Sequence, residues 1–162
     1  MRYILSVGHR DVESIVLIYG DMLYRLCLVM LKNKSDAEDA VQDTIIKYLE
    51  KAPEFKDSEH EKAWLITVAT NKCRDMLRFK QRHSQLSLDY VPEMSTNSSD
   101  SGILEALMAL PEKFRMVLIL YYVEGYPIND IAKMIRRTPS AVKMRLQKGR
   151  KLLEEKYRKE YL

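Results

Sequence analysis

Residues 128–151 read INDIAKMIRRTPSAVKMRLQKGRK and predict two helices joined by a tight turn. Thr138 is a suitable N-cap for the second helix, because its hydroxyl can accept a hydrogen bond from a free amide of the first turn. Pro139 then fits the first helical position, where its missing N–H costs nothing. The apolar residues of the first segment recur at helical spacing on one face, which consists of Ile128, Ile131, Ala132 and Ile135.

The second segment carries seven basic residues and no acidic one between Arg136 and Lys151. Helical spacing divides its side chains into two faces. The inner face consists of Val142, Leu146, Gly149 and Leu153, and the outer face of Ser140, Lys143, Met144, Gln147, Lys148 and Lys151. An outer face of long cationic and amide side chains suits the major groove of DNA. The alternative is a solvated basic helix within a helical bundle.

The whole chain has 162 residues, of which 46% are apolar, with only five Gly and five Pro. This composition favours an all-α fold with enough apolar residues for a core. The net charge of +4 is unevenly distributed: −2 over residues 1–50, +3 over 51–82, −4 over 83–110 and +7 over 111–162. Such segregation indicates an anionic partner for particular faces of the protein.

The two cysteines, Cys27 and Cys73, lie too far apart in sequence for a metal-ligand or redox motif. We expect both to be packing groups, and the protein to be cytoplasmic. The N-terminus has no run suited to a signal peptide, and we expect no membrane-spanning stretch.

Residues 83–100, HSQLSLDYVPEMSTNSSD, lack periodicity and are rich in Ser, Asn and Thr. Such a stretch buries too little apolar surface to order itself, so it predicts a flexible linker. The sequence therefore predicts two small helical domains, residues 1–82 and 101–162, the second with the helix-turn-helix.

The first module begins with a predicted helix, or two, over residues 11–32, with Val16, Leu23, Leu26, Cys27, Met30 and Leu31 as its apolar positions. Ser35 and Glu38 then have the spacing of a capping box that opens a second helix. Its predicted inward side chains are Ala37, Ala40, Val41, Thr44, Ile45, Tyr48 and Leu49. Its outer face includes Asp39, Gln42, Asp43 and Ile46, which is either a solvated surface or a protein-docking surface.

A third helix is predicted over residues 61–82, after the loop 53–59. Its predicted core positions are Leu65, Val68, Ala69, Cys73, Met76 and Leu77. A polar, basic strip is left alongside, made of Lys62, Thr70, Asn71, Arg74 and Arg78. Trp64 and Phe55 border this strip, where aromatic rings can stack on unpaired bases. For Trp64 we favour a place in the core.

Two parts of the chain resemble the domains of a bacterial sigma factor. The resemblance to the promoter-melting domain covers residues 35–55, SDAEDAVQDTIIKYLEKAPEF, and 61–78, EKAWLITVATNKCRDMLR. The resemblance to the promoter-binding helix-turn-helix domain covers residues 110–153, LPEKFRMVLILYYVEGYPINDIAKMIRRTPSAVKMRLQKGRKLL. These two domains in this order are typical of the extracytoplasmic-function group of sigma factors.

The resemblance implies a transcription initiation factor that binds core RNA polymerase and promoter DNA, and commonly an anti-sigma factor. It implies polymerase docking through Asp39, Gln42, Asp43 and Ile46. It implies capture of unpaired −10 bases by the loop from Pro53 to Glu61 and by Lys56, Lys62, Asn71, Arg74 and Arg78. It implies reading of the −35 element around Thr138 and Ser140, through Lys143, Met144, Gln147 and Lys148, with Arg136 and Arg137 on phosphates. Arg115, in the helix 114–122, belongs to the part that would pack on the polymerase flap.

Three positions depart from the family pattern. Arg136 stands at the turn where the family often has Gly, so we expect a less favourable backbone conformation there. Ala141 replaces a frequent Thr, and Thr70 stands where a basic residue is common.

The sequence shows no grouping of a nucleophile with a base, no metal cluster and no phosphate-cradling glycine loop. We therefore expect a protein that is not an enzyme and needs no cofactor. Two other classes remain as alternatives: a stand-alone helix-turn-helix transcriptional regulator, and a helical adaptor that binds only protein. Copurification with core polymerase and promoter-specific transcription would separate a sigma factor from both.

Overall fold

The computed structural model describes residues 10–83 and 98–161, and all regular elements in these ranges are helices. The chain forms two compact units, Met1–Leu88 and Asp89–Leu162. The predicted all-α fold with two helical units is therefore confirmed. Most of the predicted linker, residues 84–97, and His9 lie outside the described residues.

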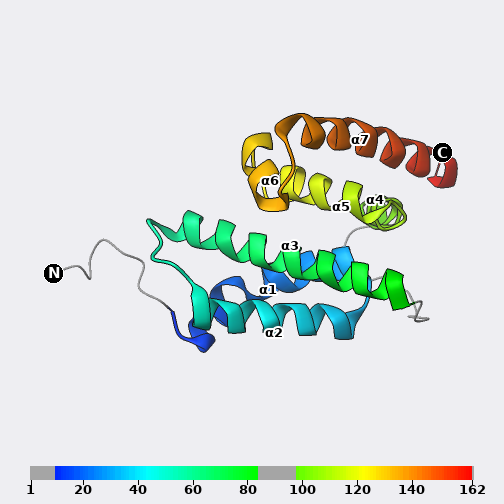
Figure 1. The fold of residues 1–162 in the computed structure, drawn as a ribbon. Helices are drawn as coiled ribbons and strands as arrows, with labels where there is room; N and C mark the ends of the chain where they lie inside the picture. The colour runs from blue at the N-terminus through cyan, green and yellow to red at the C-terminus, as the bar shows by residue number, and fades with distance from the viewer. Residues whose placement is uncertain (1–9, 84–97, 162) are drawn as a thin grey trace. The chain divides into compact units, whose positions relative to one another are not determined.

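The first unit is built from three long helices, and each packs against the other two (Figure 1). They are α1 (Val12–Leu31), α2 (Lys34–Lys51) and α3 (Ser58–His83). The start of α1 is capped by Asp11, whose carboxylate accepts a 2.8 Å hydrogen bond from the amide of Ser14. Cys27 and Cys73 are fully buried, as expected of packing groups.

Two predicted core positions of the first unit are wrong. Val16 is 47% exposed and Leu49 is 51% exposed. In α1 the buried positions of the first two turns are Ile15 and Tyr19 instead. Apolar character at helical spacing does not distinguish two neighbouring faces when both carry apolar side chains, as they do in α1.

The predicted capping box at Ser35 and Glu38 is also wrong. Helix α1 ends at Leu31, with Lys32 as its C-cap, and α2 begins at Lys34, with Asn33 as its N-cap. The Asn33 side chain accepts a 2.9 Å hydrogen bond from the amide of Asp36. Asn is as good a cap as Ser, and here it also lets the chain turn directly after α1.

By length and composition, α1 is apolar enough to cross a membrane, contrary to the expectation that no stretch is. Half of this apolar window is buried inside the protein, where it packs against α2 and α3. A core helix passes the same test, so the finding is weak evidence for a membrane span.

In the second unit α4, α5 and α6 pack against the long helix α7. Helix α5 continues directly into a π-helical turn, η2. The amide of Glu124, just after this turn, donates a 3.0 Å hydrogen bond to the carbonyl of Ile119. Gly125, with a φ of 75°, then ends the segment in a conformation that glycine adopts without strain. The elements are α4 (Ser98–Met108), α5 (Glu112–Leu118), η2 (Ile119–Val123), α6 (Ile128–Ile135) and α7 (Pro139–Tyr161).

Candidate nucleic-acid interface

The turn between α6 and α7 has the geometry that the sequence predicts. The Thr138 hydroxyl oxygen accepts a 3.1 Å hydrogen bond from the amide of Ala141, and Pro139 is the first residue of α7. Arg136 ends α6 in the left-handed region, with φ 57° and ψ 49°. A side chain at this conformation is strained, as expected for a position where the family often has Gly.

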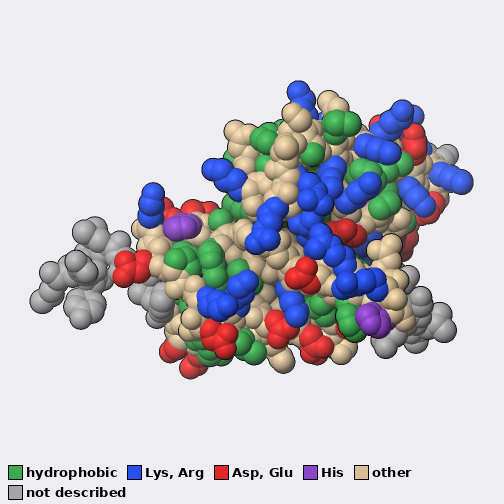
Figure 2. Space-filling model, viewed as in Figure 1, with side chains coloured by type: hydrophobic (Ala, Val, Ile, Leu, Met, Phe, Trp, Pro, Cys, Tyr) green, Lys and Arg blue, Asp and Glu red, His purple; other side chains and the backbone are tan. Residues whose placement is uncertain are grey.

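Helix α7 buries one face and exposes the other. Val142 and Leu146 are buried, and at Gly149 a Cβ would lie 3.3 Å from Cδ1 of Leu118, so the helix approaches α5 closely there. Met144 is 68% exposed. The predicted outer-face residues are all exposed, namely Ser140, Lys143, Met144, Gln147, Lys148 and Lys151. In the space-filling view many Lys and Arg side chains are visible over the helices of the second unit (Figure 2).

A hollow of about 740 Å³ lies beside this outer face and is lined in part by Met144, Gln147 and Lys148. Two further lining residues, Lys113 and Phe114, come from α5 and were not among the predicted site residues. The ammonium groups of Lys113 and Lys148 lie 5.1 and 5.8 Å from the centre of the Phe114 ring, within the range of cation–π attraction. The fold thus adds a lysine from another helix to the predicted cationic face.

The turn adds two further cations, Arg136 and Arg137, next to the N-terminal end of α7. Arg136 and Arg137 are exposed, and one Arg137 guanidinium nitrogen donates a 3.3 Å hydrogen bond to the carbonyl of Arg136. Burial first, and then the charge of Arg137, lower the pKa of Arg145. Cations that repel one another in this way favour an anionic partner.

In the first unit the predicted basic strip is only partly brought together. Asn71, Arg74 and Arg78 follow one another at helical spacing along α3. Lys62 lies nine positions before Asn71. In an ideal helix of 3.6 residues per turn this spacing places the two side chains on roughly opposite sides of the helix. Thr70, which was placed in the strip, is fully buried and donates a 3.1 Å hydrogen bond to the carbonyl of Thr67.

The loop before α3 is anchored by a buried aromatic ring. Phe55 is 2% exposed and packs against Tyr48, His60 and Trp64, with ring centres 6.0, 5.3 and 5.8 Å away. Trp64 is only half-buried, so it contacts the core while keeping part of its surface in solvent. Lys56, the predicted DNA-binding residue of the loop, is exposed.

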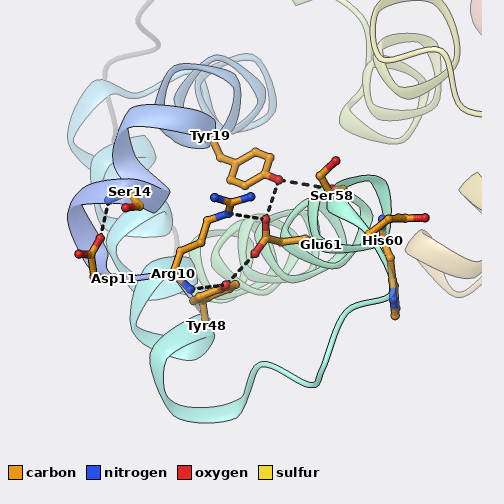
Figure 3. Close-up of polar contacts among 9 residues, drawn as sticks. Arg10, Asp11, Ser14, Tyr19, Tyr48, Ser58, His60 and Glu61 are labelled. Carbon is orange, nitrogen blue, oxygen red and sulfur yellow. Dashed lines mark hydrogen bonds and ion pairs between the residues drawn. The ribbon is translucent and has the colours of Figure 1, made fainter. Parts of the chain in front are cut away.

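A buried carboxylate, Glu61, lies in the first turn of the helix that follows this loop (Figure 3). It was not among the predicted site residues, because no sequence pattern marks it as buried. The side chain of Glu61 is fully buried and accepts hydrogen bonds from the hydroxyls of Tyr19 and Tyr48, both at 2.7 Å. The Arg10 guanidinium donates a third hydrogen bond at 3.0 Å, and the Arg10 amide donates to the Tyr48 hydroxyl oxygen at 3.1 Å. We call Arg10, Tyr19, Tyr48 and Glu61 the Glu61 cluster.

The cluster keeps its carboxylate ionised. Burial alone would raise the pKa of Glu61, but hydrogen bonds from Tyr48, Tyr19 and Arg10 outweigh burial and the pKa lies below its ordinary value of 4.5. Burial, with the neighbouring carboxylate, raises the pKa of Tyr48 to about 12 and that of Tyr19 further. At neutral pH the cluster is therefore a carboxylate held by two neutral phenols and one cation.

The predicted docking residues share one exposed face of α2. Asp39, Gln42 and Asp43 are exposed, and Ile46 is 50% exposed. Asp43 is not isolated, because its carboxylate pairs with the Lys72 ammonium of α3 at 2.9 Å. Leu49, found exposed one turn further along, extends the apolar end of this face.

Comparison with known proteins gives the same two regions. The model of Sigma-70 region 2 matches residues 15–83, and that of Sigma-70, region 4, matches residues 101–153. The ECF RNA polymerase sigma factor SigW of Bacillus subtilis (strain 168) is 29% identical over 93% of this chain and 91% of its own length. The RNA polymerase sigma factor SigV of the same organism is 30% identical over 86% of each chain.

Solved structures show the same fold. The sigma factor RpoE, crystallised with the anti-sigma factor NepR from Bartonella quintana, matches with a TM-score of 0.76 and 24% identity, over 90% of this chain and 96% of its own. CnrH, solved in complex with the cytosolic domain of CnrY, matches with a TM-score of 0.62 and 22% identity, over 88% of this chain and 84% of its own.

The two matched regions stand in the order that the sequence resemblance implied, and the relatives are covered over most of their length. The chain therefore belongs to the extracytoplasmic-function group of RNA polymerase sigma factors and is a transcription initiation factor that directs RNA polymerase to promoters.

Proposed function

We propose that the outer face of α7 reads the −35 element of the promoter. The observation that carries this assignment is the separation of faces on α7, with Val142 and Leu146 buried and the long polar side chains exposed. Lys148 can bind guanine and Gln147 can pair with adenine in the major groove, while Met144 can only pack against thymine methyl groups or the groove wall. Arg136 and Arg137, at the turn, contact phosphates. Thr138 and Ser140 lie at the start of α7, where free amides also favour a phosphate.

We propose that the loop before α3 and the polar side chains of that helix hold the unpaired −10 strand. Lys56 on the loop is exposed and gives the strand a cation. Asn71, Arg74 and Arg78 add polar and cationic groups along α3, and the free part of Trp64 offers a surface for stacking. Lys62, on another side of α3, contributes through its charge.

The face of α2 formed by Asp39, Gln42, Asp43 and Ile46 docks on core RNA polymerase in this proposal. It combines acidic, amide and apolar side chains that the protein itself leaves exposed. In the second unit an apolar groove of about 530 Å³ includes Leu118, Ile119, Tyr122 and Val123, which suits packing on the polymerase flap. Arg115 is buried and donates to the carbonyls of Met108 and Leu110, so its role is to hold this segment in place.

The protein acts in the cytoplasm, performs no catalysis itself and is restrained by an anti-sigma factor. The last point is supported by a solved structure of the same fold, the sigma factor RpoE, which was co-crystallised with the anti-sigma factor NepR. We also propose the domains 1–82 and 101–162 with a linker over 83–100. The matched regions, residues 15–83 and 101–153, support the limits of the linker.

The test is reconstitution with core RNA polymerase and a library of random promoter DNA. We expect the wild-type protein to bind core polymerase and to select templates with one −35 and one −10 sequence, which are then transcribed. A protein that binds DNA alone and neither joins the polymerase nor changes its start sites would be a stand-alone regulator, and the proposal would be wrong.

A further inference from the structure

The loop between α2 and α3, residues 52–57, is closed at both ends by one pair of side chains. Tyr48 lies in the last turn of α2, and Glu61 lies in the first turn of α3. The Tyr48 hydroxyl donates a 2.7 Å hydrogen bond to Glu61 across the base of the loop (Figure 3). The distance between the two ends of the loop is therefore fixed by a directional contact and not by apolar packing alone.

The same carboxylate connects the loop to the beginning of the chain. Arg10 donates both its amide, to Tyr48, and its guanidinium, to Glu61. From α1, the Tyr19 hydroxyl donates to Glu61 and lies 3.4 Å from the carbonyl of Ser58, the first residue of α3. The segment before α1, helix α1 and helix α2 thus meet at one carboxylate of α3.

The loop is held from its other side by the Phe55 ring, which is buried among Tyr48, His60 and Trp64. The amide of Lys56 donates a 3.2 Å hydrogen bond to Nδ1 of His60, and the amide of His60 donates a 2.8 Å hydrogen bond to Asp57. Tyr48 belongs to both supports, because its hydroxyl contacts Glu61 and its ring contacts Phe55. A change at the cluster is therefore transmitted to the backbone that presents Lys56.

A buried carboxylate is an expensive way to fill space, since it is costly unless each lone pair finds a donor. An apolar side chain would fill the position without that requirement. What three donors add is geometry, because each hydrogen bond fixes both a distance and a direction.

We propose that the Glu61 cluster, including Arg10 from the segment before α1, positions the loop for capture of unpaired −10 bases. The inference rests on the proposed −10 function of that loop. Arg10, Tyr19, Tyr48 and Glu61 are positioning residues: they act through the loop and the first turn of α3 and touch no base themselves.

The test uses the full chain bound to core polymerase and two DNA probes. One probe carries the −10 non-template strand in single-stranded form, with the sequence that wild-type holoenzyme selects, and the other is a duplex with the −35 element alone. Tyr48→Phe keeps the ring on Phe55 and removes only the hydroxyl, and Glu61→Gln keeps the shape but replaces an acceptor by a donor. We expect each variant to bind the −10 strand about tenfold more weakly, the loss that one displaced buried hydrogen bond produces, and the −35 duplex as wild type does.

Cys27→Ala is the matched control, because it removes a fully buried atom from α1 two turns beyond Tyr19. It should lower the melting temperature without weakening −10 binding measured well below that temperature. Binding of the −10 strand by Tyr48→Phe equal to wild type would overturn the inference, and Tyr48→Phe decides the matter if Glu61→Gln does not fold. The inference would also be overturned if Cys27→Ala lost −10 binding in proportion to its loss of stability, since the cluster would then be only structural. A wild-type holoenzyme that fails to bind the −10 strand would refute the proposed function of the loop instead.

Discussion

The first unit buries a carboxylate among hydrogen-bond donors, whereas the outer face of α7 in the second unit leaves its lysines in solvent. Glu61 is fully buried and accepts three hydrogen bonds, while Lys143, Lys148 and Lys151 are exposed along a stretch without a single acid. The buried charge acts on the protein itself, by fixing how three segments meet. The exposed charges do little for the fold and are available to an anionic partner. Measurements of folding stability and its pH dependence therefore test the Glu61 cluster. Measurements of how DNA binding depends on salt and on base sequence test α7.

The largest expected effect is the loss of stability in Glu61→Ala. The substitution leaves the Tyr19 and Tyr48 hydroxyls and the Arg10 guanidinium without their acceptor, which should lower the free energy of unfolding by about 3 kcal/mol. Lys148→Ala, an exposed site, should change it by less than about 0.5 kcal/mol. Chemical denaturation followed by circular dichroism measures both. Equal losses in the two variants would erase the contrast between the two units.

The pH dependence of stability sharpens the same contrast. Because the folded-state pKa of Glu61 lies below 4.5, its contribution is present above pH 4.5 and is lost as the pH falls through the folded-state value. The advantage of wild type over Glu61→Gln should thus be full at pH 7 and shrink in acid. At the alkaline end, Tyr48 has a pKa raised from 10.0 to about 12, so its contribution is lost as the pH rises over that interval, and Tyr48→Phe should lack that loss. Thermal melts across pH measure both, and a constant difference between wild type and Glu61→Gln down to pH 3 would contradict the description of the cluster.

A smaller effect is expected at the turn of the second unit. Arg136 has a φ of 57°, so Arg136→Gly should relieve strain and raise the free energy of unfolding by about 1 kcal/mol. Arg137→Gly is the matched control, because it removes the same charge at a neighbouring residue without a positive φ. Both variants should reduce the salt dependence of DNA binding by about one counterion. Equal stability of the two variants would mean that the turn stores no strain at Arg136.

The sequence predicted those features that depend on neighbouring residues. Thr138 and Pro139 mark the start of α7 by local chemistry, and the structure confirms the cap. The predicted start of α2 is wrong because Asn33 and Ser35 are both good caps, and how closely α2 follows α1 decides between them. Val16 was placed in the core because it is apolar, while the buried position belongs to Tyr19, whose hydroxyl has a partner 42 residues away.

The rest could not be predicted because it depends on contacts between distant segments. Glu61 reads in sequence as an ordinary acid in the first turn of a helix, which suits the helix dipole. Its burial follows from Arg10 and the two tyrosines, which only the fold brings together. Lys113 likewise joins the cationic face of α7 only because α5 packs against that helix at Gly149.

The most direct test of the central claim is binding of holoenzyme to a panel of single-base −35 variants at two salt concentrations. Gln147→Ala and Lys148→Ala should weaken binding to the preferred sequence by about 1–3 kcal/mol and relax the preference at one base each. Arg137→Ala should weaken binding to all sequences alike and reduce the salt dependence by about one counterion. If Gln147→Ala and Lys148→Ala instead weaken all sequences equally, as Arg137→Ala does, the outer face of α7 only attracts phosphates and does not read the promoter.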